Sequence, residues 1–177
     1  MKNYIAYITD LVGCSIEDKI GIPGQYGKLA RKVFKNGLSI WEVDGKEMLP
    51  DDTFQAVSFH TYNEIRPGVT ADPFQKDWKI FDIDMQFILL TYLEKTGDVW
   101  ELMESFDYDY KYAELNAESE VTKLTGSVKF TAVQDDPERI IDTFFPIYKP
   151  NLQQSQLQLT GIQVNYGLTL SICEYCF

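Results

Sequence analysis

The feature that most constrains this chain is a strict alternation close to its C-terminal end. From Ile162 to Ile172, every second residue is large and apolar, and the residues between them are polar or small. A period of two over this length is the pattern of a β-strand with one face buried in a core. An uncovered strand edge invites pairing with another chain. We therefore expect the final strand to have an unpaired edge, and we expect oligomerisation to place a second subunit beside that edge.

Other segments predict further strands and four helices. A hairpin is expected over residues 38–49, because Asp44-Gly45 provides the positive φ angles of a type I′ turn. Extended segments are predicted at residues 54–62, 79–92 and 128–132. Helices are predicted at residues 4–12, at 26–35 with Asn36-Gly37 as C-cap, from Asp98 through 106 into 107–115, and from Asp136-Pro137 onward.

These elements predict one α+β domain over residues 1–177. Strands with one polar face favour a mainly antiparallel sheet with helices packed on one face. An N-terminal helical segment, residues 1–36, precedes the sheet. Residues 63–77 show no regular period and are expected to form a long loop, of the kind that reaches a neighbouring subunit or merely extends over the surface.

The net charge of the chain limits the kinds of molecule that it can bind. The net charge is −11, whereas a protein that grips nucleic acid needs clustered cations to displace counterions from phosphates. Residues 1–36 hold six basic and three acidic side chains, a local +3, which leaves −14 on the rest. Such a basic segment can dock against an acidic partner or a second copy, or it can be a solvated helix face. No apolar run is long enough for a membrane span, so we expect no membrane partner.

Two motifs with cysteine or histidine are weak. Cys173 and Cys176 form a C-x-x-C pair, but only Cys14 and His60 could complete a zinc site with them. Residues three apart on a strand point to opposite faces, so ordinary cysteines are expected. His60 is the single histidine, and its neighbours lack a nucleophile-elbow pattern. It is interpreted as a hydrogen-bonded strand histidine rather than a catalytic base.

Asp82 and Asp84 share one face of a predicted strand, about 7 Å apart along it. Two carboxylates at such a distance suit a glycosidase or a divalent cation. A catalytic pair also needs one desolvated acid, and the apolar opposite face places these two in water. We therefore expect a solvated face, with no cofactor and no metal.

A resemblance gives these elements a context. The segments "DWKIFDIDMQFILLTY … GDVWELMESF" and "VNYGLTLSICEYCF" resemble the tail terminator and head–tail connector proteins of tailed bacteriophages, over roughly residues 77–177. Those proteins have a long amphipathic strand, then a helix, and end on a strand that completes the sheet.

The resemblance implies a structural virion protein, made in the host cytoplasm, rather than an enzyme. Its partners would be copies of itself in a ring, often six- or twelve-fold, together with neck, portal or tail tube proteins. DNA would pass through the ring without specific binding, which suits an acidic protein. The expected subunit contacts are Lys28, Arg31, Lys32, Lys35, Arg66 and Asn165.

Two alternatives remain open from the residues. One is a small hydrolase that uses Asp82, Asp84 or His60 in a cleft bounded by the long loop. The other is a general interaction module of a bacterial assembly. Oligomeric state separates the ring from the hydrolase, because a monomer with a deep carboxylate-lined cleft would favour an enzyme.

Overall fold

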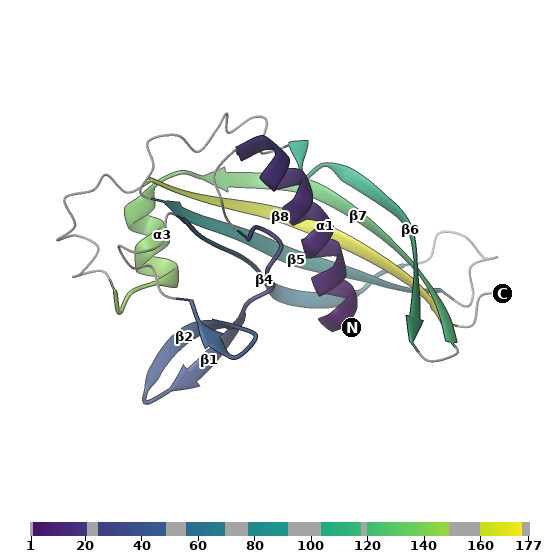
Figure 1. Ribbon diagram of the computed structural model, residues 1–177, viewed down its shortest axis with the longest axis horizontal. Coiled ribbons are helices and arrows are strands. Elements are labelled where there is room, and N and C mark those ends of the chain that lie inside the picture. The colour runs from purple at the N-terminus through teal and green to yellow at the C-terminus, as the bar shows by residue number, and fades with distance from the viewer. Residues whose placement is uncertain are drawn as a thin grey trace.

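The computed structural model describes residues 2–20, 25–48, 56–69, 78–91, 104–117, 120–148 and 160–174. Figure 1 shows a long twisted sheet with one helix across it, a second helix at one end and a projecting hairpin. The elements are α1 (Lys2–Ile20), β1 (Arg31–Lys35), β2 (Leu38–Val43), β3 (Lys46–Glu47), β4 (Ala56–Pro67), β5 (Trp78–Thr91), β6 (Tyr108–Ala117), β7 (Glu120–Gln134), α3 (Pro137–Phe144) and β8 (Thr160–Glu174).

Two antiparallel sheets are present in the described chain. The larger has the order β4-β5-β8-β7-β6, and the smaller has the order β1-β2-β3. The predicted α+β class with a mainly antiparallel sheet is therefore confirmed.

The strand predicted from residue 162 to residue 172 is confirmed as β8, but its position corrects the sequence argument. It lies in the middle of the sheet, where Tyr166 is opposite Met85 of β5 and Phe130 of β7. The strand's neighbours are thus strands of the same chain, and the expectation that its edge needs a second subunit is wrong. A long strand buried on one face gains most in the centre, where both rows of backbone groups find partners.

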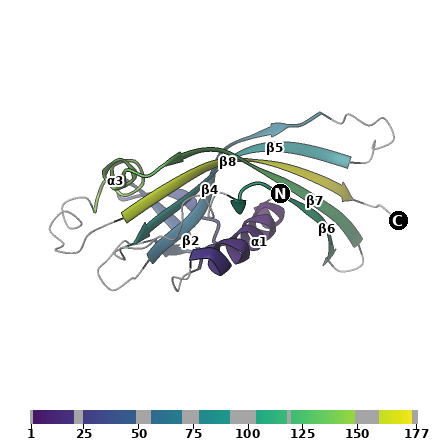
Figure 2. The same cartoon turned by 90° about the horizontal axis from the view of Figure 1, so that it is seen from above.

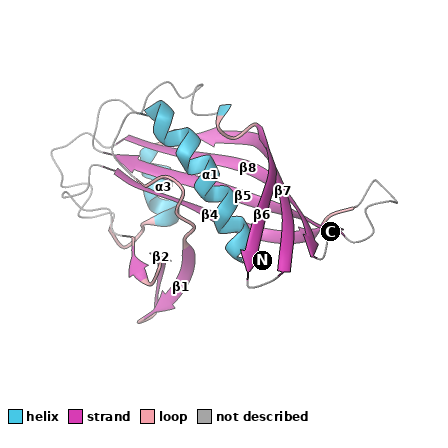
Figure 3. Cartoon of the chain, turned by 45° about the vertical axis from the view of Figure 1, so that its right-hand side comes forward, coloured by secondary structure: helices cyan, strands magenta, loops and turns pink. Residues whose placement is uncertain are grey.

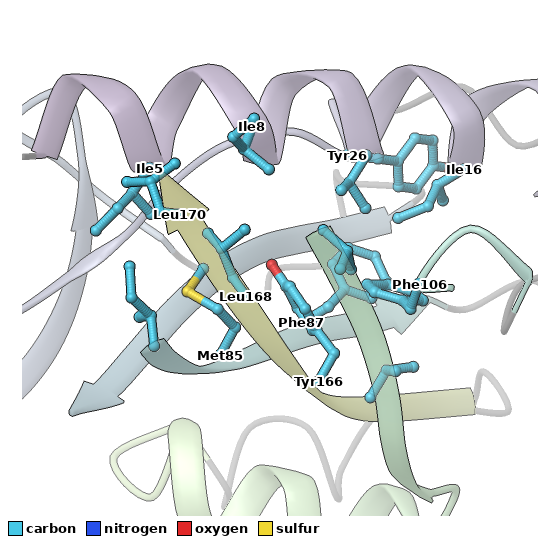
Figure 4. Packing of buried hydrophobic residues seen from close by; sticks show 14 of the residues in the cluster. Ile5, Ile8, Ile16, Tyr26, Met85, Phe87, Phe106, Tyr166, Leu168 and Leu170 are labelled. Atoms are coloured by element: carbon cyan, nitrogen blue, oxygen red, sulfur yellow. The ribbon is translucent and has the colours of Figure 1, made fainter. Parts of the chain in front are cut away.

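The helix α1 covers the concave side of the arched sheet (Figure 2). Its residues Ile5, Ile8, Val12 and Ile16 recur at helical spacing, and all are buried. They pack on the alternating apolar residues of β5 and β8, as Figure 4 shows for Leu168, Leu170, Met85 and others. The helix extends from Lys2 to Ile20, so it is longer than the predicted helix over residues 4–12.

The helix α3 packs on the opposite face, at one end of the sheet. Its buried residues Ile140, Ile141 and Phe144 belong to a second apolar cluster with Ile88 and Leu90 of β5. The end of β5 is a continuous apolar run that is buried on both faces, so it needs cover from both sides. The two helices therefore divide between the faces. Figure 3 shows α1 in front of the sheet and α3 behind it.

The start predicted for α3 is confirmed. Asp136 is the N-cap, and its side-chain oxygen accepts hydrogen bonds from the backbone N–H groups of Glu138 and Arg139. Pro137 occupies the first helical turn, where the missing N–H costs nothing.

The helix predicted over residues 26–35 is wrong. Residues 31–35 form β1, which pairs with β2 in an antiparallel hairpin. Asn36 and Gly37 have φ angles of 52° and 79°, so both occupy the left-handed region. Two such residues in succession make the type I′ turn of a hairpin, whereas a helix C-cap needs only one. Among the described residues of the segment 1–36, the helical part is therefore α1.

Two further predictions need correction. Residues 108–115 belong to β6 rather than to a helix, and the acid–tyrosine alternation in this segment has the period of a strand. Residues 63–67, expected in the long loop, belong to β4. Residues 70–77 of that loop and residues 98–103 of the predicted third helix lie outside the described residues. The predicted hairpin turn at Asp44-Gly45 is confirmed by φ angles of 51° and 77°.

Candidate interaction surfaces

The hairpin of β1 and β2 is fixed to the body at its base. The indole of Trp41 packs against Phe59 of β4 and Phe144 of α3, with ring centroids 5.4 and 5.7 Å apart. The Tyr148 hydroxyl donates a hydrogen bond to the carboxylate of Glu47 in β3. Burial, and then this carboxylate, raise the pKa of Tyr148 to about 12. The hairpin is therefore an anchored arm whose turn projects from the body (Figure 1).

The tip of this arm exposes apolar side chains. Phe34 is 78% exposed and Leu38 is 48% exposed. Phe34 is opposite Ser39, and Leu38 is opposite Lys35, so the two apolar side chains lie on opposite faces of the hairpin. Exposed apolar area at the end of a projecting arm gains free energy when a partner covers it.

Four predicted subunit contacts gather on or beside the arm. Lys28 is 3.5 Å from Asp44, Arg31 is 3.3 Å from Glu42, and the Lys32 ammonium is 5.9 Å from the centre of the Trp41 ring. The ion pairs leave 40% of the Lys28 side chain and 65% of the Arg31 side chain exposed, and surface pairs contribute about 1 kcal/mol or less, so both cations remain available to a second surface. Within the described chain, Lys35 at the tip has no ion pair.

The arm and the body have opposite charge. Residues 28–48 carry five basic and three acidic side chains, a net +2, which leaves −13 on the rest of a chain with net charge −11. The prediction placed these cations on a helix face, whereas Arg31, Lys32 and Lys35 lie on β1. On a strand, Arg31 and Lys35 share one face and Lys32 lies on the other.

Arg66 and Asn165 lie on a second surface, the outer face of the sheet away from α1. An Arg66 Nη2 hydrogen bond joins Asp84 at 2.7 Å. The side-chain oxygen of Asn165 accepts hydrogen bonds from Gln163 at 2.9 Å and from Gln86 at 3.3 Å. Four of the predicted contacts therefore lie on or beside the arm, and the other two lie on this polar outer face.

Asp82 and Asp84 are on the same outer face, as the alternation predicts. Asp82 accepts a hydrogen bond from the Thr169 hydroxyl at 2.8 Å, while Asp84 pairs with Arg66. The side chain of Asp84 is 50% exposed. Each carboxylate is thus turned to a different neighbour on an open, solvated face.

His60 is enclosed in the core. Its Nε2 is 2.7 Å from the carbonyl oxygen of Tyr26, which can only accept, so this nitrogen carries the proton. Its Nδ1, 2.8 Å away, accepts from the Tyr166 hydroxyl. The side chain is fully buried against Phe87, and this burial lowers the pKa of His60 to about 3. The interpretation as a hydrogen-bonded strand histidine is confirmed.

A cleft of about 460 Å³ opens beside α1, and the sequence did not indicate it. One wall is the helix face with Asp10, Gly13, Cys14 and Glu17, and the other is residues 25–28. The walls approach so closely that a Cβ on Gly13 would meet a backbone nitrogen at 2.3 Å. Asp10, Cys14 and Glu17 have the i, i+4, i+7 spacing that places side chains on one face of a helix. The sequence therefore contains a signal for this polar face, but the apolar residues of the same helix dominate its pattern.

The cleft has a negative wall and an accessible thiol. Burial, with a smaller contribution from the negative charge of Glu17, raises the pKa of Tyr26 to about 12. Cys14 is an exposed free cysteine. Lys28, at the other wall, is drawn toward Asp44 of the arm.

The remaining cysteine prediction is corrected in part. Cys173 is buried and disulfide-bonded rather than an ordinary thiol. Cys176 lies outside the described residues.

Among the residues that the structure describes, no group of three or more histidine, cysteine or acidic side chains is arranged to hold a metal ion. No described helix is both long and apolar enough to cross a membrane.

No protein-family model matches this chain, and no curated protein matches it.

Proposed function

We propose that this protein is a structural subunit of a ring in the neck of a tailed bacteriophage, as a tail terminator or a head–tail connector. The observation that carries the proposal is the anchored basic arm on an acidic body. A ring needs two different patches that meet head to tail, because a self-complementary patch gives a twofold dimer instead. The arm is one patch, and its charge selects an acidic counterpart on the next copy.

The sheet supports the same proposal. β8 enters between β5 and β7 and completes the sheet, which is the arrangement that the resemblance to tail terminator and connector proteins implies. Those strands form a single broad layer with the larger apolar cluster on the α1 side and a smaller one under α3. Such a layer is a rigid base from which an arm can reach a neighbour.

The charge balance supports a DNA-conducting role. DNA slides through a ring only if the lining does not hold its phosphates, and net negative charge disfavours counterion release. The body outside the arm carries a net charge of −13 and therefore repels DNA. The basic arm does not hold DNA because it contacts the neighbouring subunit. The proposed partners are therefore further copies in a six- or twelve-fold ring and, along its axis, portal, neck or tail tube proteins. The proposed location is the virion.

The hydrolase alternative has less support from the same residues. His60 is enclosed with both ring nitrogens hydrogen-bonded, and Asp82 and Asp84 each bond to a different neighbour on an open face. A general interaction module would share the arm, and ring closure is the property that separates it from the proposal.

Sedimentation velocity on charge-reversed variants tests the role of the arm. Arg31→Glu with Lys35→Glu should weaken assembly, and raising the salt should weaken wild-type assembly in the same direction. The matched control is Lys79→Glu with Lys129→Glu, which makes the same change in net charge on exposed residues of the sheet. Assembly that survives the arm reversal, or that falls equally in the control, would count against the arm.

A further inference from the structure

The α1 wall of the cleft is acidic, and the tip of the arm is basic. We infer that the cleft of one copy receives the arm tip of the next copy, an inference that rests on the proposed ring. The occupants are side chains of the tip, within the segment from Arg31 to Leu38 of a second chain. Because tip and cleft are different patches of one subunit, this contact is of the head-to-tail kind that closes into a ring.

The spacing of charges supports this pairing. Asp10 and Glu17 lie on one face of α1, seven residues or about 10 Å apart along the helix axis. Arg31 and Lys35 lie on one face of β1, four residues or about 13 Å apart along the strand. Long, flexible basic side chains readily span that difference, so Lys35 can pair with Glu17 of the neighbouring cleft while Arg31 pairs with Asp10.

The size of the cleft limits what it can receive. Its volume of about 460 Å³ is that of a small-molecule pocket, so it takes side chains of the tip and not the whole segment from Arg31 to Leu38. Gly13 and Gly27 also line the cleft, at the place where its two walls are in contact. Phe34 and Leu38 lie on opposite faces of the hairpin, so an inserted tip presents an apolar side chain to each wall.

A chain does not fill its own cleft with its own arm. Lys28 belongs to the cleft wall and stands only three residues before β1, while the contacts of Trp41 fix the base of the hairpin. The tip is directed away from α1 in Figure 1. The cleft is therefore left for a tip supplied by another copy.

A charge swap tests the pairing. Glu17→Lys and Lys35→Glu should each weaken self-association about tenfold in sedimentation equilibrium, since each places like charges together. The double variant should recover to within about threefold of the wild type. As a control, Glu17→Lys combined with Lys129→Glu has the same net charge and should not recover. No recovery in the first double variant, or equal recovery in the control, would overturn the pairing.

Cys14 provides an independent readout. Its modification by N-ethylmaleimide, followed by mass spectrometry of the peptide that contains it, should be about tenfold slower in the assembled wild type than in the Lys35→Glu variant. A ring in which Cys14 reacts as fast as in the dissociated variant would overturn this inference and leave the proposed ring standing. A wild type that never assembles would overturn the ring, and with it this inference.

Discussion

Lowering the pH from 7 to 5 should destabilise the folded chain through His60. Burial lowers the pKa of this imidazole to about 3, from an ordinary value of 6.5. A second ring proton would have to go on Nδ1, which already accepts the hydrogen bond of Tyr166. The folded protein therefore keeps His60 neutral at pH values where the unfolded chain protonates it.

The size of this effect follows from proton linkage. Between pH 6.5 and pH 3 the unfolded chain binds more protons at this site than the folded chain does, so the free energy of unfolding rises with pH in that window. The slope approaches about 1.4 kcal/mol per pH unit, and the loss between pH 7 and pH 5 is about 2 kcal/mol. That loss is a large part of a typical stability of about 5–15 kcal/mol.

Urea unfolding at pH 7, 6 and 5, followed by tryptophan fluorescence at one protein concentration, measures the loss. His60→Gln should remove the contribution of about 2 kcal/mol to the pH dependence, although its stability at pH 7 is lower. Tyr166→Phe is the matched comparison, because it deletes the hydrogen-bond donor but keeps a buried histidine and should keep the pH dependence. The reasoning would be refuted if the wild type and His60→Gln lost the same stability between pH 7 and pH 5.

Three further predictions concern stability and can be measured by urea unfolding. Gly13→Ala should destabilise by about 1–3 kcal/mol, because the clash with backbone at 2.3 Å outweighs the gain in helix propensity of about 1 kcal/mol. Gly167→Ala, where nothing lies within 4 Å of the new Cβ, is its control and should be nearly neutral. Asp136→Ala should cost about 1 kcal/mol by removing the N-cap of α3. Asp82→Asn with Asp84→Asn should change stability by about 1 kcal/mol or less and leave assembly intact, and a larger loss would contradict a solvated face.

The alternation from Ile162 to Ile172 was sufficient to predict the strand and its buried face. It was not sufficient to predict the neighbours of that strand. Side-chain period reports which face meets the core, whereas pairing depends on backbone groups that are the same at every residue. A period of two is therefore equally compatible with a central strand and an edge strand, and β8 is central.

The arm shows a different limit. Leu29, Val33 and Phe34 have helical spacing, and this short pattern favoured a helix over residues 26–35. The decisive signal was Asn36-Gly37, a dipeptide that suits a type I′ turn as well as a helix C-cap. The sequence identified the cations of this segment. Only the observed strand β1 shows that they lie on two faces, with Arg31 and Lys35 on one and Lys32 on the other.

The cleft could not be predicted, since it depends on contact between α1 and residues 25–28. That contact requires glycine at both Gly13 and Gly27, where a Cβ would meet backbone atoms of the opposite segment. Glycines in a helix and in the loop after it indicate a close approach only when the fold brings them together. His60 likewise gained its role from Tyr26 and Tyr166, which are distant in the sequence.

Cryo-electron microscopy of the purified protein, alone and mixed with phage portal and tail tube proteins, tests the proposed ring most directly. We predict closed rings of six or twelve copies with a central channel, in which the β1–β2 arm of each copy contacts the α1 side of the next. Particles that remain monomeric at high concentration and form no complex with portal or tail tube proteins would contradict the proposal.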